Sequence, residues 1–316
     1  MDVVGLGFSS LDYVGIVPHL PRLDEGMGLS DLTTQGGGPV AQALVTLARL
    51  GANAGYIGRF GDDDAGITMR RSLEDEGVDL AELQLERGAT SAQCIILVDQ
   101  ATGKRSICAY QGTAGDVTVS SLSLDYVCSG RYLHLDGFSM KGALAAARAA
   151  RTSGVRVCLD AGGPFERLRE LIEATDILIA NEQFALDAGR GDYELGAARL
   201  RAFGPSIVVA TLGAAGSYTL TGDEAFLIPS FPVDVVDTTG AGDVFHGAYL
   251  YGLLQRWPPR QVAVFANAAA ALKCTRLGGR AGIPRLAAVQ SFLQDREHTI
   301  PFSSGALAVD RNQGDG

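Results

Sequence analysis

The residues best suited to chemistry lie in the segment DTTGAGD, positions 237–243. Gly240, Ala241 and Gly242 are small enough for a ligand to approach the backbone, and we expect a helix to begin at about residue 242. Successive amides at a helix N-terminus form a cradle that favours an anion such as a phosphate. Asp243 would repel that anion unless a metal ion compensates, or unless Asp243 accepts the proton of a substrate hydroxyl as a general base. The alternative is a first-turn acid that only stabilises the helix.

A second group of candidates lies near the N-terminus. An apolar run from Val3 to Phe8 predicts a buried strand, and Asp12 follows just beyond it. Gly37 and Gly38 precede a segment with helical apolar spacing, at a position where a ligand could lie against the backbone. Asp12 as a turn cap, and the two glycines as ordinary turn residues, are the alternatives.

Other reactive side chains show no local pattern of a site. The five cysteines form no CxxC pair and the four histidines form no HxxxH pair, so we expect reduced, buried thiols and no structural metal site. Lys104 and Arg105 follow an expected hairpin turn. They are predicted to be solvated charges, and binding of an anionic substrate is the alternative for them.

The order of the expected elements favours an α/β fold. From about residue 131, the strands YLHLD, VRVCLD, ILIA and SIVVAT alternate with helical stretches. Such alternation implies right-handed crossovers and a parallel sheet with helices on both faces. Two strand-like excursions, residues 13–35 and 90–110, predict a small β lid, with edge strands of the main sheet as the alternative. The predicted units are a core of residues 1–12, 36–89 and 111–297, this lid, and a flexible tail at 298–316.

The composition excludes several function classes. The 316 residues carry 26 Lys and Arg against 36 Asp and Glu, a formal net charge of −10. We expect no nucleic-acid partner, because neutralising phosphates requires a basic surface. No apolar run approaches the roughly 20 residues that span a bilayer, and the N-terminus lacks the basic and apolar regions of a secretory signal. We therefore expect a cytoplasmic protein without a membrane partner.

Several motifs occur in an order that resembles one enzyme family. Beside DTTGAGDVFHGAY, they are GLGFSSLD at 5–12, GGGPVAQALVTLARLGA at 36–52, IGRFGDD at 57–63, NEQF at 181–184 and VVATLGAAGS at 208–217. Together they resemble the ribokinase-like (PfkB) family of carbohydrate kinases. The resemblance implies a three-layer α/β/α fold with a mostly parallel sheet and a small β-sheet lid. The last third is most similar to the sulfofructose-kinase and ketohexokinase-like branches.

The resemblance also implies a role for individual residues. Asp243 is similar to the catalytic base, and Gly240, Ala241 and Gly242 to the anion hole that offsets charge on the transferred phosphoryl group. Those implied to bind the sugar are Asp12, Gly37, Gly38 and Asp243; those implied to bind the nucleotide are Thr211, Gly213, Gly216 and Asn267. Asn181 and Glu182 would organise magnesium, and Asp237 and Thr239 a monovalent cation, K+. MgATP is the implied donor. For Asn267, a buried polar side chain with a backbone partner is the alternative.

Two positions depart from the family pattern. Ala41 stands where the family usually carries an Asn that contacts sugar hydroxyls, so one hydrogen bond to the substrate is missing or remodelled. Phe184 stands at the Glu position of the NxxE motif that helps to organise magnesium. Glu182 is an imperfect substitute, because it points to another side of a helix.

The residues around the expected acceptor pocket favour a neutral substrate. Met27, Ala109 and Phe138 are small or apolar where an anion would require Lys, Arg or Asn, because an unpaired buried anion is costly. We predict ATP-dependent phosphorylation of a hydroxyl on a small neutral sugar, a ketose or an aldose. The alternatives are a nucleoside kinase, with Phe138, Tyr110 and Met27 stacked on a flat ring, a kinase of phosphorylated or sulfonated sugars, and a non-catalytic nucleotide or sugar sensor. A dinucleotide-dependent oxidoreductase is disfavoured, because GLGFSS lacks the GxGxxG fingerprint. The edges of the lid would offer a surface for a homodimer.

Overall fold

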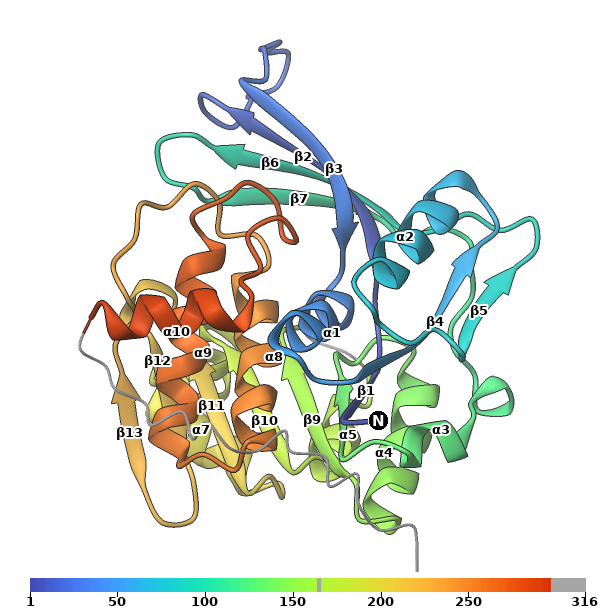
Figure 1. Ribbon diagram of the computed structural model, residues 1–316, viewed down its shortest axis with the longest axis vertical. Helices are drawn as coiled ribbons and strands as arrows, with labels where there is room; N and C mark the ends of the chain where they lie inside the picture. Colours follow the sequence, from blue (N-terminus) through green and yellow to red (C-terminus); the bar gives the residue numbers. More distant parts are fainter. Residues whose placement is uncertain (164–165, 297–316) are drawn as a thin grey trace, which may run out of the picture.

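A nine-stranded sheet forms the centre of the computed structural model, which describes residues 1–163 and 166–296 (Figure 1). The strand order is β13-β12-β11-β10-β9-β8-β1-β4-β5. The strands from β11 to β5 in this order run parallel, whereas β12 and β13 form an antiparallel meander at one end. The strands are β1 (Val3–Leu6), β4 (Ala54–Gly61), β5 (Leu83–Glu86), β8 (Tyr132–Leu135), β9 (Arg156–Ala161), β10 (Ile177–Asn181), β11 (Ile207–Thr211), β12 (Ser217–Leu220) and β13 (Ala225–Ile228).

Helices cover both faces of this sheet and enclose two apolar cores. On β1, Val3 belongs to one core and its neighbour Val4 to the other, because successive side chains of a strand point to opposite faces. The first core contains α1 (Pro39–Leu50), α2 (Asp64–Glu74), α8 (Ala241–Leu254), α9 (Pro259–Lys273) and α10 (Leu286–Gln294). The second contains α3 (Leu124–Cys128), α4 (Met140–Thr152), α5 (Leu168–Glu173), α6 (Glu182–Gly189) and α7 (Tyr193–Arg201). A mostly parallel sheet between two helical layers confirms the predicted fold class.

A separate sheet of four strands stands off the central sheet (Figure 1). Its order is β3-β2-β6-β7, and β2 and β6 form its one parallel pair. The strands are β2 (Ser10–Val17), β3 (Asp31–Gly37), β6 (Gln93–Asp99) and β7 (Arg105–Tyr110). The two predicted excursions therefore pair with each other and not with an edge of the central sheet. We call these four strands the small sheet; its action as a lid, and the predicted division into core and lid, stay predictions.

The small sheet also exposes apolar side chains on its outward face. Tyr13 and Ile95 are register partners on β2 and β6, and they are 38% and 58% exposed. Leu32 on β3 is 60% exposed. The homodimer predicted through the edges of this sheet stays a prediction. The predicted tail, residues 298–316, lies outside the described residues. Among the described helices, none is both long enough and apolar enough to cross a membrane.

Candidate active site

A cavity of about 490 Å³ lies where the carboxyl ends of the parallel strands face the small sheet. Ligands of open α/β sheets bind at this end of the strands. Of the predicted site residues, those that line the cavity are Asp12, Gly38, Asn181, Thr211, Thr239, Gly240, Gly242 and Asp243. Those that do not line it are Gly37, Glu182, Gly213, Gly216, Asp237, Ala241 and Asn267. The fold thus brings the predicted base, part of the anion hole and the predicted sugar carboxylate to one enclosed space.

Residues 240–242, which we call the phosphate turn, form the N-terminus of α8. Gly240 is the N-cap residue and has φ 76°, in the left-handed region that glycine adopts without steric cost. At Gly242 an ideal Cβ would meet no heavy atom within 4 Å, so a ligand can lie against the backbone there. The helix that follows has 14 residues, and its dipole and first-turn amides favour an anion at this end.

Four aspartates line the cavity, and the pKa of each is raised. The pKa of Asp243 is raised to about 7, mainly by burial and also by the nearby Asp160, whereas Arg105 and Lys273 oppose the rise. Burial is also the largest cause at Asp136 and Asp160, whose pKa values rise to about 7, and at Asp12, whose pKa rises to about 6. Carboxylates that share an enclosed space disfavour one another's ionised form. Such shifted groups in a cavity are typical of catalytic sites.

Asp12 is held firmly at the start of the small sheet. It is 4% exposed, and the Ser10 hydroxyl donates a hydrogen bond to its Oδ1 at 2.6 Å. An ideal Cβ on Gly37 would lie 1.9 Å from Asp12 Oδ2, so only glycine leaves room for this carboxylate. Gly38, with φ 94°, is the N-cap residue of α1. Gly37 therefore shapes the site although it does not line the cavity.

The predicted nucleotide-binding residues are only partly brought together. Thr211, at the end of β11, lines the cavity. Gly213 and Gly216 lie in the following turn with φ 55° and 103°. Asn267 on α9 is 5% exposed, and its Nδ2 donates a hydrogen bond to the carbonyl of Ile228 at 3.0 Å. This is the buried polar role that the sequence left open as the alternative, and contact of Asn267 with adenine stays a prediction.

Oxygen ligands suited to magnesium line the cavity, and of the predicted pair only Asn181 is among the lining residues. Asn181 lines the cavity, but its Oδ1 accepts a hydrogen bond from the Phe184 amide at 2.8 Å and its Nδ2 donates to the Gly162 carbonyl at 3.1 Å. Glu182 does not line the cavity, and Phe184 packs against the second core. Asp160, on the neighbouring strand β9, does line it and offers a carboxylate, a ligand that Mg²⁺ prefers.

The predicted monovalent-cation residues lie beside a lysine that the sequence analysis did not single out. Asp237 is fully buried, and its Oδ1 accepts hydrogen bonds from the amide and the hydroxyl of Thr239, both at 2.7 Å. Lys273 Nζ donates to the Asp237 carbonyl at 2.8 Å and lies 3.9 Å from Asp237 Oδ2. Burial lowers the pKa of Lys273, and Asp237 opposes that change. The sequence feature that could have pointed to this buried lysine is its position within the apolar stretch AAALKC.

Arg105 reaches Thr238, beside the phosphate turn, from the small sheet. Its Nη1 donates a hydrogen bond to the Thr238 hydroxyl at 3.3 Å, and the side chain lines the cavity. Arg105 is exposed, as predicted for a solvated charge, but β7 also brings it to the cavity; Lys104 is exposed too. Phe138 also lines the cavity and stacks on Phe8 with ring centroids 4.7 Å apart.

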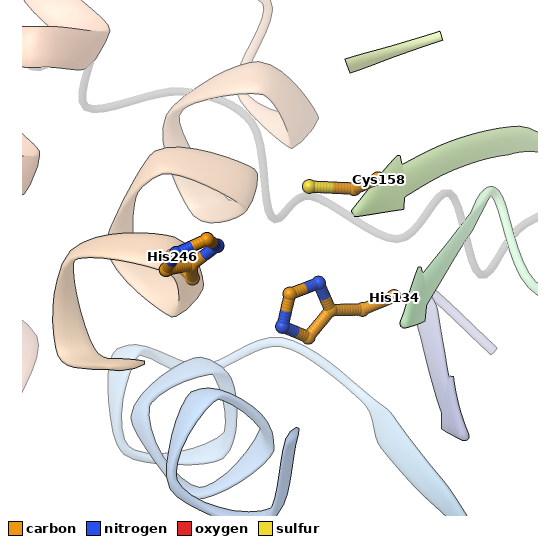
Figure 2. Close-up of side chains that lie close together, drawn as sticks. All are labelled: His134, Cys158 and His246. Carbon is orange, nitrogen blue, oxygen red and sulfur yellow. The ribbon is translucent and has the colours of Figure 1, made fainter. Parts of the chain in front are cut away.

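A buried cluster of metal-ligating residues borders the cavity. Figure 2 shows His134, Cys158 and His246 close together, on β8, β9 and α8. Their potential ligand atoms all lie within 4.8 Å of one another, and each residue is at most 3% exposed. The expectation of no metal site rested on local spacing. It could not detect this cluster, because the register of β8 with β9 and the packing of α8 bring the three residues together.

A helix N-terminus that favours an anion, together with carboxylates in one cavity beside a mostly parallel sheet, is typical of α/β phosphotransferases. The family model described as pfkB family carbohydrate kinase matches residues 2–286, and the chain belongs to that family. An ATP-dependent ribose-1-phosphate kinase of Halopiger xanaduensis is 31% identical over 93% of this chain and 98% of that protein. An aminoimidazole riboside kinase of Salmonella typhimurium is 30% identical over 81% of this chain and 87% of that protein.

The structural comparison agrees with this assignment of the fold. The structure of Arabidopsis thaliana ribokinase complexed with ribose and ATP superposes with a TM-score of 0.79 and is 24% identical, covering 93% of this chain and 98% of that chain. The chain is thus a carbohydrate kinase with the ribokinase-like fold, as its motifs predicted.

Proposed function

We propose that this kinase transfers the terminal phosphoryl group of ATP to a hydroxyl of a small neutral sugar, a ketose or an aldose, with Asp243 as the general base. The observation that carries the proposal is that Asp243 and two residues of the phosphate turn, Gly240 and Gly242, line the same cavity as Asp12. A sugar whose hydroxyls bind Asp12 would have another hydroxyl within reach of Asp243. The reaction then needs mainly positioning and charge stabilisation, which is how phosphoryl transfer is generally catalysed.

The state of Asp243 suits proton acceptance. Its pKa of about 7 lies near neutral pH, where a general base both is ionised in part and retains driving force for proton transfer. As the sugar oxygen attacks phosphorus, the hydroxyl proton passes to an Oδ atom of Asp243. The amides of the phosphate turn and Arg105 offset the negative charge that the phosphoryl group carries between donor and acceptor.

The donor side of the cavity supports ATP with magnesium. The glycine turn after Thr211 lies beside the cavity and would approach the nucleotide through its backbone. Asp160 and Asn181 would hold magnesium through its bound waters. The ion, when bound, supplies positive charge that neutralises the phosphate oxygens. Asp160 thus replaces the missing Glu of the NxxE motif in this proposal.

The charges in the cavity support a neutral acceptor. Among the described lining residues there are four carboxylates, those of Asp12, Asp136, Asp160 and Asp243, and one guanidinium, that of Arg105. Arg105 already contacts Thr238 beside the phosphate turn, and no other Lys or Arg side chain among the described residues lines the cavity, so a second anion would have no further cation in direct contact with it. The name of the Halopiger relative keeps a sugar phosphate as the second candidate acceptor. A nucleoside would instead use the Phe8 and Phe138 rings.

A coupled assay of ADP release over neutral ketoses, aldoses, nucleosides and sugar phosphates tests this proposal. We expect turnover with a neutral sugar that depends on Asp243 and on magnesium. Turnover confined to sugar phosphates or nucleosides would replace the proposed acceptor with the respective alternative. Tight binding of sugar and ATP in calorimetry, without a phosphorylated product, would refute catalysis and identify a sensor.

A further inference from the structure

Lys273 is a positive charge enclosed next to the phosphate turn. It is the last residue of α9 and has 0% exposure. The two other lysines of the chain, Lys104 and Lys141, are exposed. Removing an ammonium group from water is costly unless it is paired and hydrogen-bonded. We therefore expect Lys273 to have a role that requires its burial.

The groups around this ammonium are those that orient the phosphate turn. Lys273 Nζ donates to the carbonyl of Asp237 at 2.8 Å and lies 3.9 Å from its Oδ2. The same carboxylate accepts hydrogen bonds from Thr239 and, at 2.7 Å, from the Gly278 amide. The amides of Val236 and Asp237 also donate to the Cys274 carbonyl, at 2.8 and 3.2 Å. The segment leading into α8 is thus tied to the end of α9, with one positive charge at the junction.

A free monovalent cation does not fit at Asp237. Both oxygens of this carboxylate already accept hydrogen bonds from within the chain, and the ammonium offsets its charge. Potassium in contact with Asp237 would lie close to Lys273, and two like charges in a buried region repel strongly. The donor set therefore disagrees with the potassium site that the family resemblance implies at Asp237 and Thr239.

We propose that the ammonium group of Lys273 takes the place of a monovalent cation and keeps the phosphate turn oriented without potassium. Lys273 acts through Asp237 and Thr239, so it is a positioning residue and not a catalytic one. The kinetic part of this inference rests on the proposed function.

A cation-dependence assay tests the proposal. Wild-type enzyme is assayed in choline chloride and in potassium, ammonium or sodium chloride at equal ionic strength, and we expect rates within about twofold. Lys273→Ala is expected to lose about tenfold or more in kcat with choline and to regain much of it with potassium or ammonium, because these ions can fill the vacated space. Lys273→Met, whose side chain keeps that space filled, should lose activity without rescue. The control Lys141→Ala should match the wild type.

Thermal unfolding gives a readout that does not depend on turnover. Potassium, compared with choline, should raise the Tm of Lys273→Ala and leave that of the wild type unchanged, because only the variant has a site to fill. The proposal is overturned if the wild type requires potassium, if Lys273→Ala is fully active in choline, or if potassium fails to stabilise that variant. If Lys273→Ala does not fold, rescue of Lys273→Met by potassium would overturn it. Absence of any sugar kinase activity would refute the proposed function alone.

The cluster of His134, Cys158 and His246 carries a second, independent inference. Both ring nitrogens of His134 and Nδ1 of His246 are buried and make no hydrogen bond of ordinary geometry within the described residues. Buried polar atoms normally have a partner, and a metal ion would accept the lone pairs that these ring nitrogens offer. The cluster borders the cavity through His246, which gives a small ion a route of entry.

The donor set identifies the class of ion. Two imidazole nitrogens and one sulfur form a ligand set that suits Zn²⁺, which keeps an open position where the protein supplies three ligands. We infer that His134, Cys158 and His246 form a zinc-binding site. On binding, the Cys158 thiol loses its proton to solvent and its sulfur forms a bond to zinc. The ion would link α8 to strands β8 and β9. Its ligand on α8, His246, lies three residues beyond Asp243.

Cobalt(II), which replaces zinc and is visible in absorption spectra, tests this site. Titration of the metal-free wild type with Co²⁺ should produce a thiolate-to-cobalt charge-transfer band that zinc abolishes. Cys158→Ser should lose the band, whereas Cys108→Ser, which removes an exposed thiol elsewhere, should retain it. Absence of the band in the wild type, or its persistence in Cys158→Ser, would refute the site. If Cys158→Ser fails to fold, His246→Gln is compared with the wild type instead. A variant that binds cobalt as tightly as the wild type would refute the site.

Discussion

Replacing Asp243 by Asn tests the central chemical assignment, because it removes the proposed base while keeping the size of the side chain. General-base catalysis contributes about 10² to 10⁴ in rate, or about 3 to 5 kcal/mol of barrier, so kcat should fall by that factor. ATP affinity should change little, since the phosphate turn and Thr211 are untouched. Asp234→Asn is the matched control, because Asp234 is an exposed carboxylate on the same segment that does not line the cavity.

The pH profile gives the same assignment a second test. With a pKa of about 7, Asp243 is half ionised at neutral pH. At one pH unit below 7, the ionised fraction of Asp243 is about fivefold smaller, and the wild-type kcat/KM should fall by the same factor. The residual activity of Asp243→Asn should lack this dependence. Steady-state kinetics of ADP release between about pH 5 and about pH 9 measure both effects. A variant with near-normal turnover, or one that keeps the wild-type profile, would remove Asp243 from the mechanism.

Three further predictions address the acceptor side, the buried acids and magnesium. Gly37→Ala should raise the KM for the sugar by about tenfold or more, because its Cβ would displace the Asp12 carboxylate, while Gly26→Ala, where a Cβ meets nothing within 4 Å, should leave KM unchanged. Equal KM values in the two variants would contradict the role of Asp12. Burial raises the pKa of Asp136 above its unfolded value of 3.8 to about 7, so its stabilising contribution is complete in acid and is lost as pH rises through about 7. The free energy of unfolding, from urea titrations of the unliganded protein, should therefore fall by a few kcal/mol between about pH 5 and about pH 8, and Asp136→Asn should make this slope shallower, with Asp160 and Asp243 contributing the rest. If Asp136→Asn left this pH dependence unchanged, the raised pKa of Asp136 would be refuted. Asp160→Asn should raise the magnesium concentration for half-maximal rate by about tenfold, whereas Glu182→Gln should not; the reverse order would return magnesium binding to Glu182.

Much of the architecture could be predicted because it follows from local patterns of apolar and small residues. Apolar runs alternating with helical stretches predicted the parallel sheet, since strands buried on both faces must be apolar throughout. The two excursions predicted a separate small sheet, although β2 begins at Ser10 and β3 ends at Gly37, outside the predicted limits. The start of α8 was predicted to within about a residue, because small residues and an acid at a helix N-terminus are a local signal.

The sequence by itself determined the family and the position of the phosphate turn, because a glycine turn, a following helix and an acid in its first turn lie within a few consecutive residues. Only the tertiary structure decided which distant groups surround that turn. Lys273 reaches Asp237 through the packing of α8 and α9, Arg105 reaches Thr238 through the small sheet, and His134 meets Cys158 through the register of two strands. Sequence spacing carries no record of such contacts, because they depend on how whole elements pack against one another.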